Sequence, residues 1–175
     1  MRMIAAILAL VLLPGAPVAV PAAAATAAAT LINCLGTTTV SFSPGLTTTP
    51  RSVVTSGQDD ATTCLSLTHP GLTSFVGPFS GTATQSCTTF FGSGSGTETL
   101  YWNDGTTSTW HYTNDFANVN GTKVGASTGR ISSGALAGAE VTQTITFANL
   151  DLTACATPAG LTEISGVDTW TITGT

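Results

Sequence analysis

Residues 97–113 have the sequence TETLYWNDGTTSTWHYT, and this stretch decides the fold. Apolar and polar residues alternate on both sides of Asn103-Asp104-Gly105, which is typical of two antiparallel strands joined by a tight turn. A two-residue Asp-Gly turn would divide the large side chains between two faces and move aromatic rings worth about 1.5–3 kcal/mol each into water. A three-residue loop that ends in a left-handed Gly105 avoids this cost. We therefore predict that loop, with one apolar face formed by Leu100, Trp102, Trp110 and Tyr112.

The opposite face of this hairpin is polar and rich in threonine. It carries an exposed aromatic ring beside a histidine, and flat aromatic faces bind the pyranose rings of sugars. Our candidate ligand-binding residues therefore lie on this face: Tyr101, His111, Thr99 and Thr109. Glu98 falls on the apolar face, where a carboxyl group could have a raised pKa and act as a general acid. Because Glu98 heads its strand, we expect it at the solvent end instead.

The rest of the chain repeats this alternating pattern. About one residue in five is threonine and 19 are glycine, which favours strands and turns over helices. Eight strands are predicted, at residues 40–42, 61–67, 81–91, 97–102, 106–113, 123–132, 140–148 and 165–173. The longest irregular stretches are expected at 43–58 and 150–163. Such a pattern is typical of a sandwich or a small barrel, and we predict a single all-β antiparallel sandwich, immunoglobulin-like or jelly-roll-like.

The N-terminal 29 residues predict export. A positive start with Arg2 precedes the apolar run 4–13, and an alanine-rich stretch with A-x-A sites follows at residues 22–29. These are the parts of a secretory signal peptide, cleaved within Ala22 to Ala29. The apolar run of about 10 residues is too short to span a bilayer. We expect a secreted, extracellular domain over residues 30–175 with no membrane span after signal cleavage.

Four cysteines fall in the expected mature domain: Cys34, Cys64, Cys87 and Cys155. An even number of cysteines suits disulfide bonds in an oxidising compartment, and three pairings are possible. We favour Cys34–Cys64 with Cys87–Cys155. The spacings contain neither a C-x-x-C motif nor a nearby histidine pair, so we expect no metal site and no cofactor.

Several turn and cysteine motifs resemble those of a known group. They are Cys34-Leu35-Gly36 running to Phe42-Ser43-Pro44-Gly45-Leu46, then Ser95-Gly96-Thr97-Glu98-Thr99 with Trp102 and Gly105, and finally Ser165-Gly166-Val167. Together they resemble small secreted β-sandwich proteins of actinobacteria, over nearly the whole mature chain. The resemblance implies the fold and export. It transfers no catalytic or binding residue, because that group has no assigned activity.

Composition also limits the function classes. The chain has only four lysine and arginine residues and a net charge of −5, which excludes a nucleic-acid-binding face. Our leading hypothesis is a non-enzymatic extracellular module that binds carbohydrate or protein or acts at the cell surface. A secreted hydrolase of glycans or esters, using His111 or Glu98, is the first alternative. A protease inhibitor presenting a loop at residues 47–56, with Arg51 as its specificity residue, is the second.

The serine motif at residues 125–129 gives the hydrolase little support. Its sequence, GASTG, matches the G-x-S-x-G nucleophile elbow. That motif works where a strand turns sharply into a helix, and residues 130–134 predict a strand and a turn instead.

Overall fold

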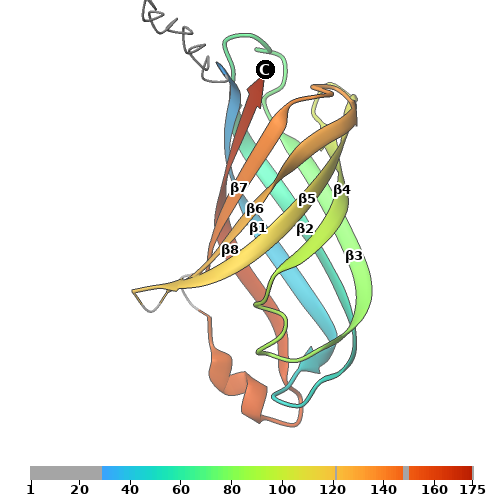
Figure 1. Ribbon diagram of the computed structural model, residues 1–175, viewed down its shortest axis with the longest axis vertical. Coiled ribbons are helices and arrows are strands. Elements are labelled where there is room, and N and C mark those ends of the chain that lie inside the picture. Colours follow the sequence, from blue (N-terminus) through green and yellow to red (C-terminus); the bar gives the residue numbers. More distant parts are fainter. Residues whose placement is uncertain (1–28, 121, 148–149, 175) are drawn as a thin grey trace, which may run out of the picture.

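Alternating side chains give every strand of this chain an inner and an outer face, and a barrel lets all the inner faces share one interior. The computed structural model describes residues 29–120, 122–147 and 150–174. Each strand pairs with the next in antiparallel fashion, and the last pairs with the first, so that the sheet closes (Figure 1). The elements are β1 (Ala29–Leu46), β2 (Arg51–Leu65), β3 (Phe75–Gln85), β4 (Gly94–Trp102), β5 (Thr107–Val119), β6 (Thr122–Gly134), β7 (Glu140–Phe147), the 3-10 helix η1 (Leu152–Ala156) and β8 (Leu161–Gly174).

The predicted sandwich is wrong, because the eight strands form one closed barrel rather than two stacked sheets. The all-β class, the antiparallel order and the number of strands are confirmed. Alternation of apolar and polar residues within each strand is equally compatible with a sandwich and with a closed barrel. What separates them is the pairing of β1 with β8, a contact between the two ends of the domain that no local pattern reveals.

Several strand bounds also differ from the prediction, and the first strand differs most in length, since it spans 29–46 rather than 40–42. Residues 43–58, expected to be irregular, form the end of β1 and the first half of β2, apart from the loop at 47–50. The third strand lies at 75–85 rather than 81–91. Inward-facing positions of β2 include Thr55, Gly57 and Asp59, which are small or polar, so the expected apolar alternation is missing there.

The hairpin at residues 97–113 is confirmed in detail. The Gly105 amide donates to the Trp102 carbonyl at 3.0 Å, and the Trp102 amide donates to the Thr106 carbonyl at 2.9 Å. Gly105 has a φ of 84°, the left-handed conformation that the three-residue loop requires. Trp102 and Trp110 lie inside the barrel, whereas Tyr101 is 51% exposed on its outer surface.

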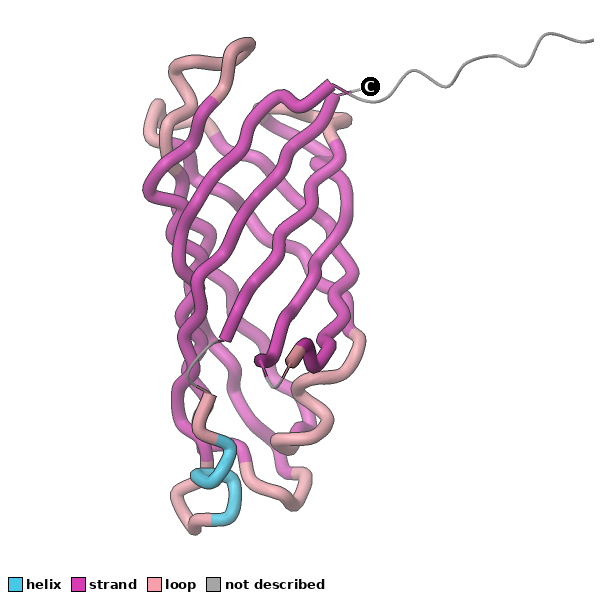
Figure 2. Tube along the Cα trace, turned by 90° about the vertical axis from the view of Figure 1, so that its left-hand side faces the viewer, coloured by secondary structure: helices cyan, strands magenta, loops and turns pink. Residues whose placement is uncertain are grey.

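The interior is filled at both ends. At the end near the C-terminus lies an aromatic plug formed by Phe75, Trp102, Trp110 and Trp170. Its rings meet edge to face, with centroids 4.9–5.0 Å apart. A second apolar cluster, which includes Phe42, Phe91 and Phe147, fills the opposite end beside η1. The strands run obliquely around this interior (Figure 2).

Both favoured disulfides are confirmed. Cys34–Cys64 joins paired residues of β1 and β2, and Cys87–Cys155 ties the segment after β3 to η1. Two disulfides indicate an oxidising, extracellular-type environment. The expected signal peptide lies outside the described residues, as does Ala148 at the end of a predicted strand. Within the described ranges, no helix has the length and apolar character needed to cross a bilayer.

We predict that Leu100→Ala lowers the free energy of unfolding by about 3 kcal/mol, because Leu100 is fully buried and its removal leaves a void. Thr99→Ala, on the outer face of the same strand, should cost less than about 1 kcal/mol. Urea denaturation followed by tryptophan fluorescence measures both. Equal losses in the two variants would contradict the assignment of the inner and outer faces.

Candidate functional site

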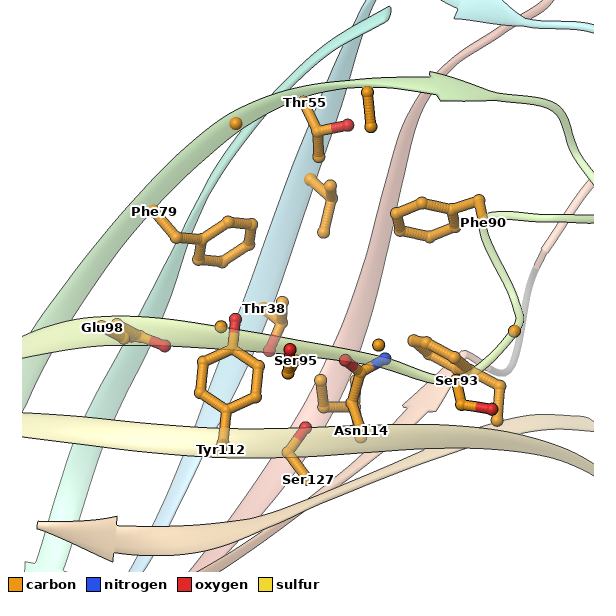
Figure 3. Close-up of a pocket in the computed structure, with 18 of the residues that line it drawn as sticks. Thr38, Thr55, Phe79, Phe90, Ser93, Ser95, Glu98, Tyr112, Asn114 and Ser127 are labelled. Atoms are coloured by element: carbon orange, nitrogen blue, oxygen red, sulfur yellow. The ribbon is translucent and has the colours of Figure 1, made fainter. Parts of the chain in front are cut away.

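The barrel wall is open between β3 and β4. These two strands pair with each other only at Phe75–Trp102 and Val76–Tyr101. Beyond these two pairs, β3 remains paired with β2 and β4 with β5, but β3 and β4 are not paired with each other. A cavity of about 410 Å³ lies behind the open stretch and is lined from both strands and the segment between them (Figure 3). Residues at its rim, such as Thr82 and Ser95, are exposed. The cavity therefore communicates with solvent through the side of the barrel.

The walls of the cavity combine aromatic and hydroxyl side chains. The aromatic contributors come from three strands and the segment after β3: Phe79, Phe90, Tyr112, Phe116 and Phe147. Thr38, Thr55 and Ser127 add hydroxyl groups, and Asn114 adds an amide. In Figure 3 the Tyr112 hydroxyl points across the cavity towards Phe79. Such a lining suits a molecule with both apolar and polar parts.

Glycines make room for the largest polar side chains. A Cβ at Gly77 on β3 would overlap the Glu98 carboxyl group, and one at Gly96 on β4 would press against the Tyr112 phenol. Glycine at these positions lets both side chains lie close to the barrel wall. The centre of the barrel consequently remains open.

Three carboxyl groups, which we call the carboxyl cluster, meet beneath the cavity. Asp59, Glu98 and Asp168 come from β2, β4 and β8 and are only 3%, 3% and 2% exposed. Asp59 and Glu98 line the cavity directly. Among the described residues, the Glu98 Oε1 atom is buried without a hydrogen-bond partner. Buried charged or polar groups are normally paired, so this unpaired oxygen marks the cluster as a candidate site.

Hydrogen bonds show how protons are distributed in the cluster. Asp168 Oδ2 accepts from the Trp170 indole at 2.9 Å and lies 3.4 Å from the Gln143 amide nitrogen. Thr38 Oγ1 lies 3.0 Å from Asp168 Oδ2 and 2.5 Å from Asp59 Oδ1. A hydroxyl group has a single proton to donate, so it cannot satisfy two ionised carboxylates. We assign the charge to Asp168, which has several donors, and a proton to Asp59.

The local environment raises the pKa of every member of the cluster. Burial, aided by the negative charge of Asp168, raises the pKa of Asp59 to about 7. Burial and the neighbouring Asp59 raise the pKa of Glu98 to about 10. Burial also raises the pKa of Asp168. The pKa of Tyr112 rises to about 12, again chiefly through burial, so its phenol remains a hydrogen-bond donor.

The basic side chains of the described chain are engaged elsewhere. Arg51 donates to a backbone carbonyl at the end of β1, and Arg130 pairs with Glu140 on the surface. Lys123 lies 5.1 Å from the centre of the Phe91 ring. The carboxyl cluster thus has no cationic partner within the part of the protein that the structure describes.

The candidates from sequence lie outside this cavity. Tyr101, His111, Thr99 and Thr109 occupy the outer face of β4 and β5, where the His111 imidazole lies 2.7 Å from the Thr97 hydroxyl. A role for these four residues stays a prediction. Sequence reasoning placed Glu98 on the apolar face, but the expectation of a solvent-exposed position is wrong, since Glu98 is 3% exposed.

Two further motifs take on a different meaning. Residues 51–56 belong to β2, so the loop expected at 47–56 for a protease inhibitor is limited to residues 47–50. Ser127 lies in the middle of β6 with strand on both sides and faces the cavity. The G-x-S-x-G match therefore forms no nucleophile elbow, which needs a turn from strand to helix.

Comparison with known proteins adds no assignment. No protein-family model, curated protein or solved structure matches this chain. In the described ranges, no group of three or more His, Cys, Asp or Glu side chains is arranged to hold a metal ion. The geometry of the cavity is therefore the basis for assigning a function.

The carboxyl cluster predicts that stability falls as pH rises. Between the ordinary carboxyl pKa and the raised values in the fold, the folded protein keeps protons that the unfolded chain releases. Each such group lowers the free energy of unfolding by up to about 1.4 kcal/mol per pH unit. Urea midpoints should therefore decrease from about pH 5 to about pH 8.

Asp59→Asn should flatten this pH dependence because it removes one of the retained protons. Asp60→Asn, which removes a carboxyl group from the outer face of the same strand, is the matched control. A midpoint that rises with pH, or an equal effect of the two variants, would show that the cluster does not hold these protons.

Proposed function

We propose that this protein binds a small, partly apolar molecule inside its barrel and acts as an extracellular binding protein. The observation that carries the proposal is the cavity of about 410 Å³ that opens between β3 and β4 and ends at Asp59 and Glu98. Small-molecule sites are concave, mostly apolar and contain a few polar groups that fix the orientation of the ligand. This cavity has each of those properties.

The lining supports one orientation for the bound molecule. Its polar end would face Glu98, Asp59 and Tyr112, where buried hydrogen-bonding groups lie close together. Its apolar part would lie among Phe79, Phe90 and Phe116. The opening between β3 and β4 provides the route of entry. An eight-stranded barrel is wide enough to hold one small ligand when part of its interior is left unfilled.

Export fits this function. The sequence predicts a signal peptide, and two disulfides suit a protein that works outside the cell. The expected non-enzymatic extracellular module is thereby narrowed to a carrier or scavenger of small molecules. Carbohydrate binding at Tyr101 and His111 would use a separate surface.

Hydrolysis is a second candidate with one observation in its favour. Asp59 and Glu98 lie in the same cavity, and their pKa values of about 7 and about 10 differ, as those of a catalytic base and acid must. An interior cavity of this size suits a small molecule better than a glycan chain. We therefore favour binding of a small molecule over hydrolysis as the function.

N-phenyl-1-naphthylamine, a neutral dye that fluoresces in apolar surroundings, tests for a cavity ligand. We predict saturable binding to the mature protein and loss of that binding in Ser127→Phe. Ser127 faces the cavity, so a benzyl group there occupies the space that the dye needs. Fluorescence titration gives the dissociation constant.

Thr128→Phe is the control for this variant. It adds the same ring one residue along β6, where the side chain is exposed on the outer face. Circular dichroism should show an unchanged strand signal in both variants. Absence of saturable dye binding, or equal loss of binding in the two variants, would refute the proposed site.

A further inference from the structure

The carboxyl cluster has no positively charged partner in the described structure. Asp59 and Glu98 reach the cavity from two different strands, and Asp168 lies behind them against Thr38. Above about pH 7 Asp59 ionises beside Asp168, and ionised carboxylates are rarely buried without a cation or several donors. The basic residues of the described chain are engaged elsewhere, as shown above. A ligand that enters the cavity is therefore the available source of positive charge.

The carboxyl groups of Asp59 and Glu98, which line the cavity, specify what the ligand must offer. Glu98 Oε1 has no hydrogen-bond partner in the described structure and lies against Gly77 in the barrel wall, while Glu98 as a whole lines the cavity. Asp59, once ionised, and the carbonyl oxygen of protonated Glu98 both accept hydrogen bonds, and a protonated amine brings three N–H donors together with a positive charge. Hydrogen bonds between ammonium and carboxylate groups are about twice as strong as neutral ones.

Aromatic rings line the same cavity. Tyr112 and Phe79 stand on the Glu98 side of the cavity, and Phe90 lies further along the wall (Figure 3). The Phe116 ring lies 6.0 Å from that of Phe90, centroid to centroid. The face of an aromatic ring attracts a cation within about 6 Å, and this attraction strengthens where water is excluded. The net charge of −5 favours the approach of a cation as well.

We propose that the ligand is an organic cation, namely a protonated amine on an apolar body, with its ammonium group held by Glu98 and Asp59. This inference rests on the proposed binding function and names its ligand class. The apolar body lies among the phenylalanine rings. Anions of the same size are disfavoured by the negative charge of Asp168 and, above about pH 7, by that of Asp59.

Amine binding is coupled to a proton. The ammonium group favours the ionised form of Asp59, so binding releases the proton that this carboxyl group otherwise keeps. The titratable groups that face Asp59 are Glu98 on β4, Tyr112 on β5 and Asp168 on β8. Affinity for an amine should therefore rise with pH until Asp59 is ionised, at about pH 7.

The test compares three probes with one skeleton: 4-phenylbutylamine, 4-phenylbutan-1-ol and 4-phenylbutanoate. Each is titrated against the complex of the mature protein with N-phenyl-1-naphthylamine at about pH 8, where the amine is protonated. We expect the amine to displace the dye at a concentration about tenfold lower than the alcohol. The carboxylate should not displace it.

Asp59→Asn should abolish the preference for the amine and retain binding of the alcohol, whereas Asp60→Asn should retain both. Wild-type protein provides a readout independent of any variant. Its affinity for the amine should weaken about tenfold for each pH unit below about 7, while its affinity for the alcohol stays constant.

The outcomes separate the two proposals. Displacement by the amine and the alcohol at equal concentrations, or preference for the alcohol or the carboxylate, overturns the cation inference and leaves the binding function standing. If the dye shows no saturable binding and none of the probes binds in a direct calorimetric titration, the proposed function fails, and the inference about its ligand fails with it.

Discussion

Burial of three carboxyl groups in one barrel, without a basic side chain beside them in the described structure, is the constraint on which the rest depends. An ionised carboxylate in an apolar interior is costly, so the cluster must keep protons, collect donors or receive a cation. Thr38, Gln143 and Trp170 supply donors to Asp168. Asp59 and Glu98 keep protons and face the cavity. The same groups thus make stability dependent on pH and determine which ligands suit the interior.

Local sequence pattern predicted the parts of the fold that depend on neighbouring residues. The hairpin at 97–113 follows from the cost of exposing aromatic rings, and its loop and inner face are confirmed. The favoured pairings Cys34–Cys64 and Cys87–Cys155 are confirmed as well. Closure of the barrel depends on β1 meeting β8, and alternation alone does not distinguish this from a sandwich. The β2 strand was partly missed because its inward positions face the cavity and are small or polar.

The candidate site was predicted only in fragments, for the same physical reason. The alternation of side chains along residues 97–102 puts Glu98 on the same face as Leu100 and Trp102. This alternation is the one feature of the sequence that indicates a buried carboxyl group. Asp59 and Asp168 gave no comparable signal, because they join Glu98 only through the long-range pairing of β2, β1 and β8. The outer-face candidates Tyr101 and His111 rest on a different signal, an exposed aromatic ring beside a histidine, which suits stacking on a sugar ring. The cavity lies on the inner side of the barrel wall, so these outer-face residues do not line it.

The most direct test is the protonation state of Glu98 at neutral pH. The chain contains three glutamates, and carbon-13 labelling of their side-chain carboxyl groups gives one NMR signal for each. Glu140 and Glu163 are exposed and serve as internal references, while Glu98→Gln identifies the third signal. We predict that Glu98 retains the chemical shift of a protonated carboxyl group at neutral pH and ionises only near its pKa of about 10. A Glu98 signal that already has the shift of a carboxylate at neutral pH would contradict this account.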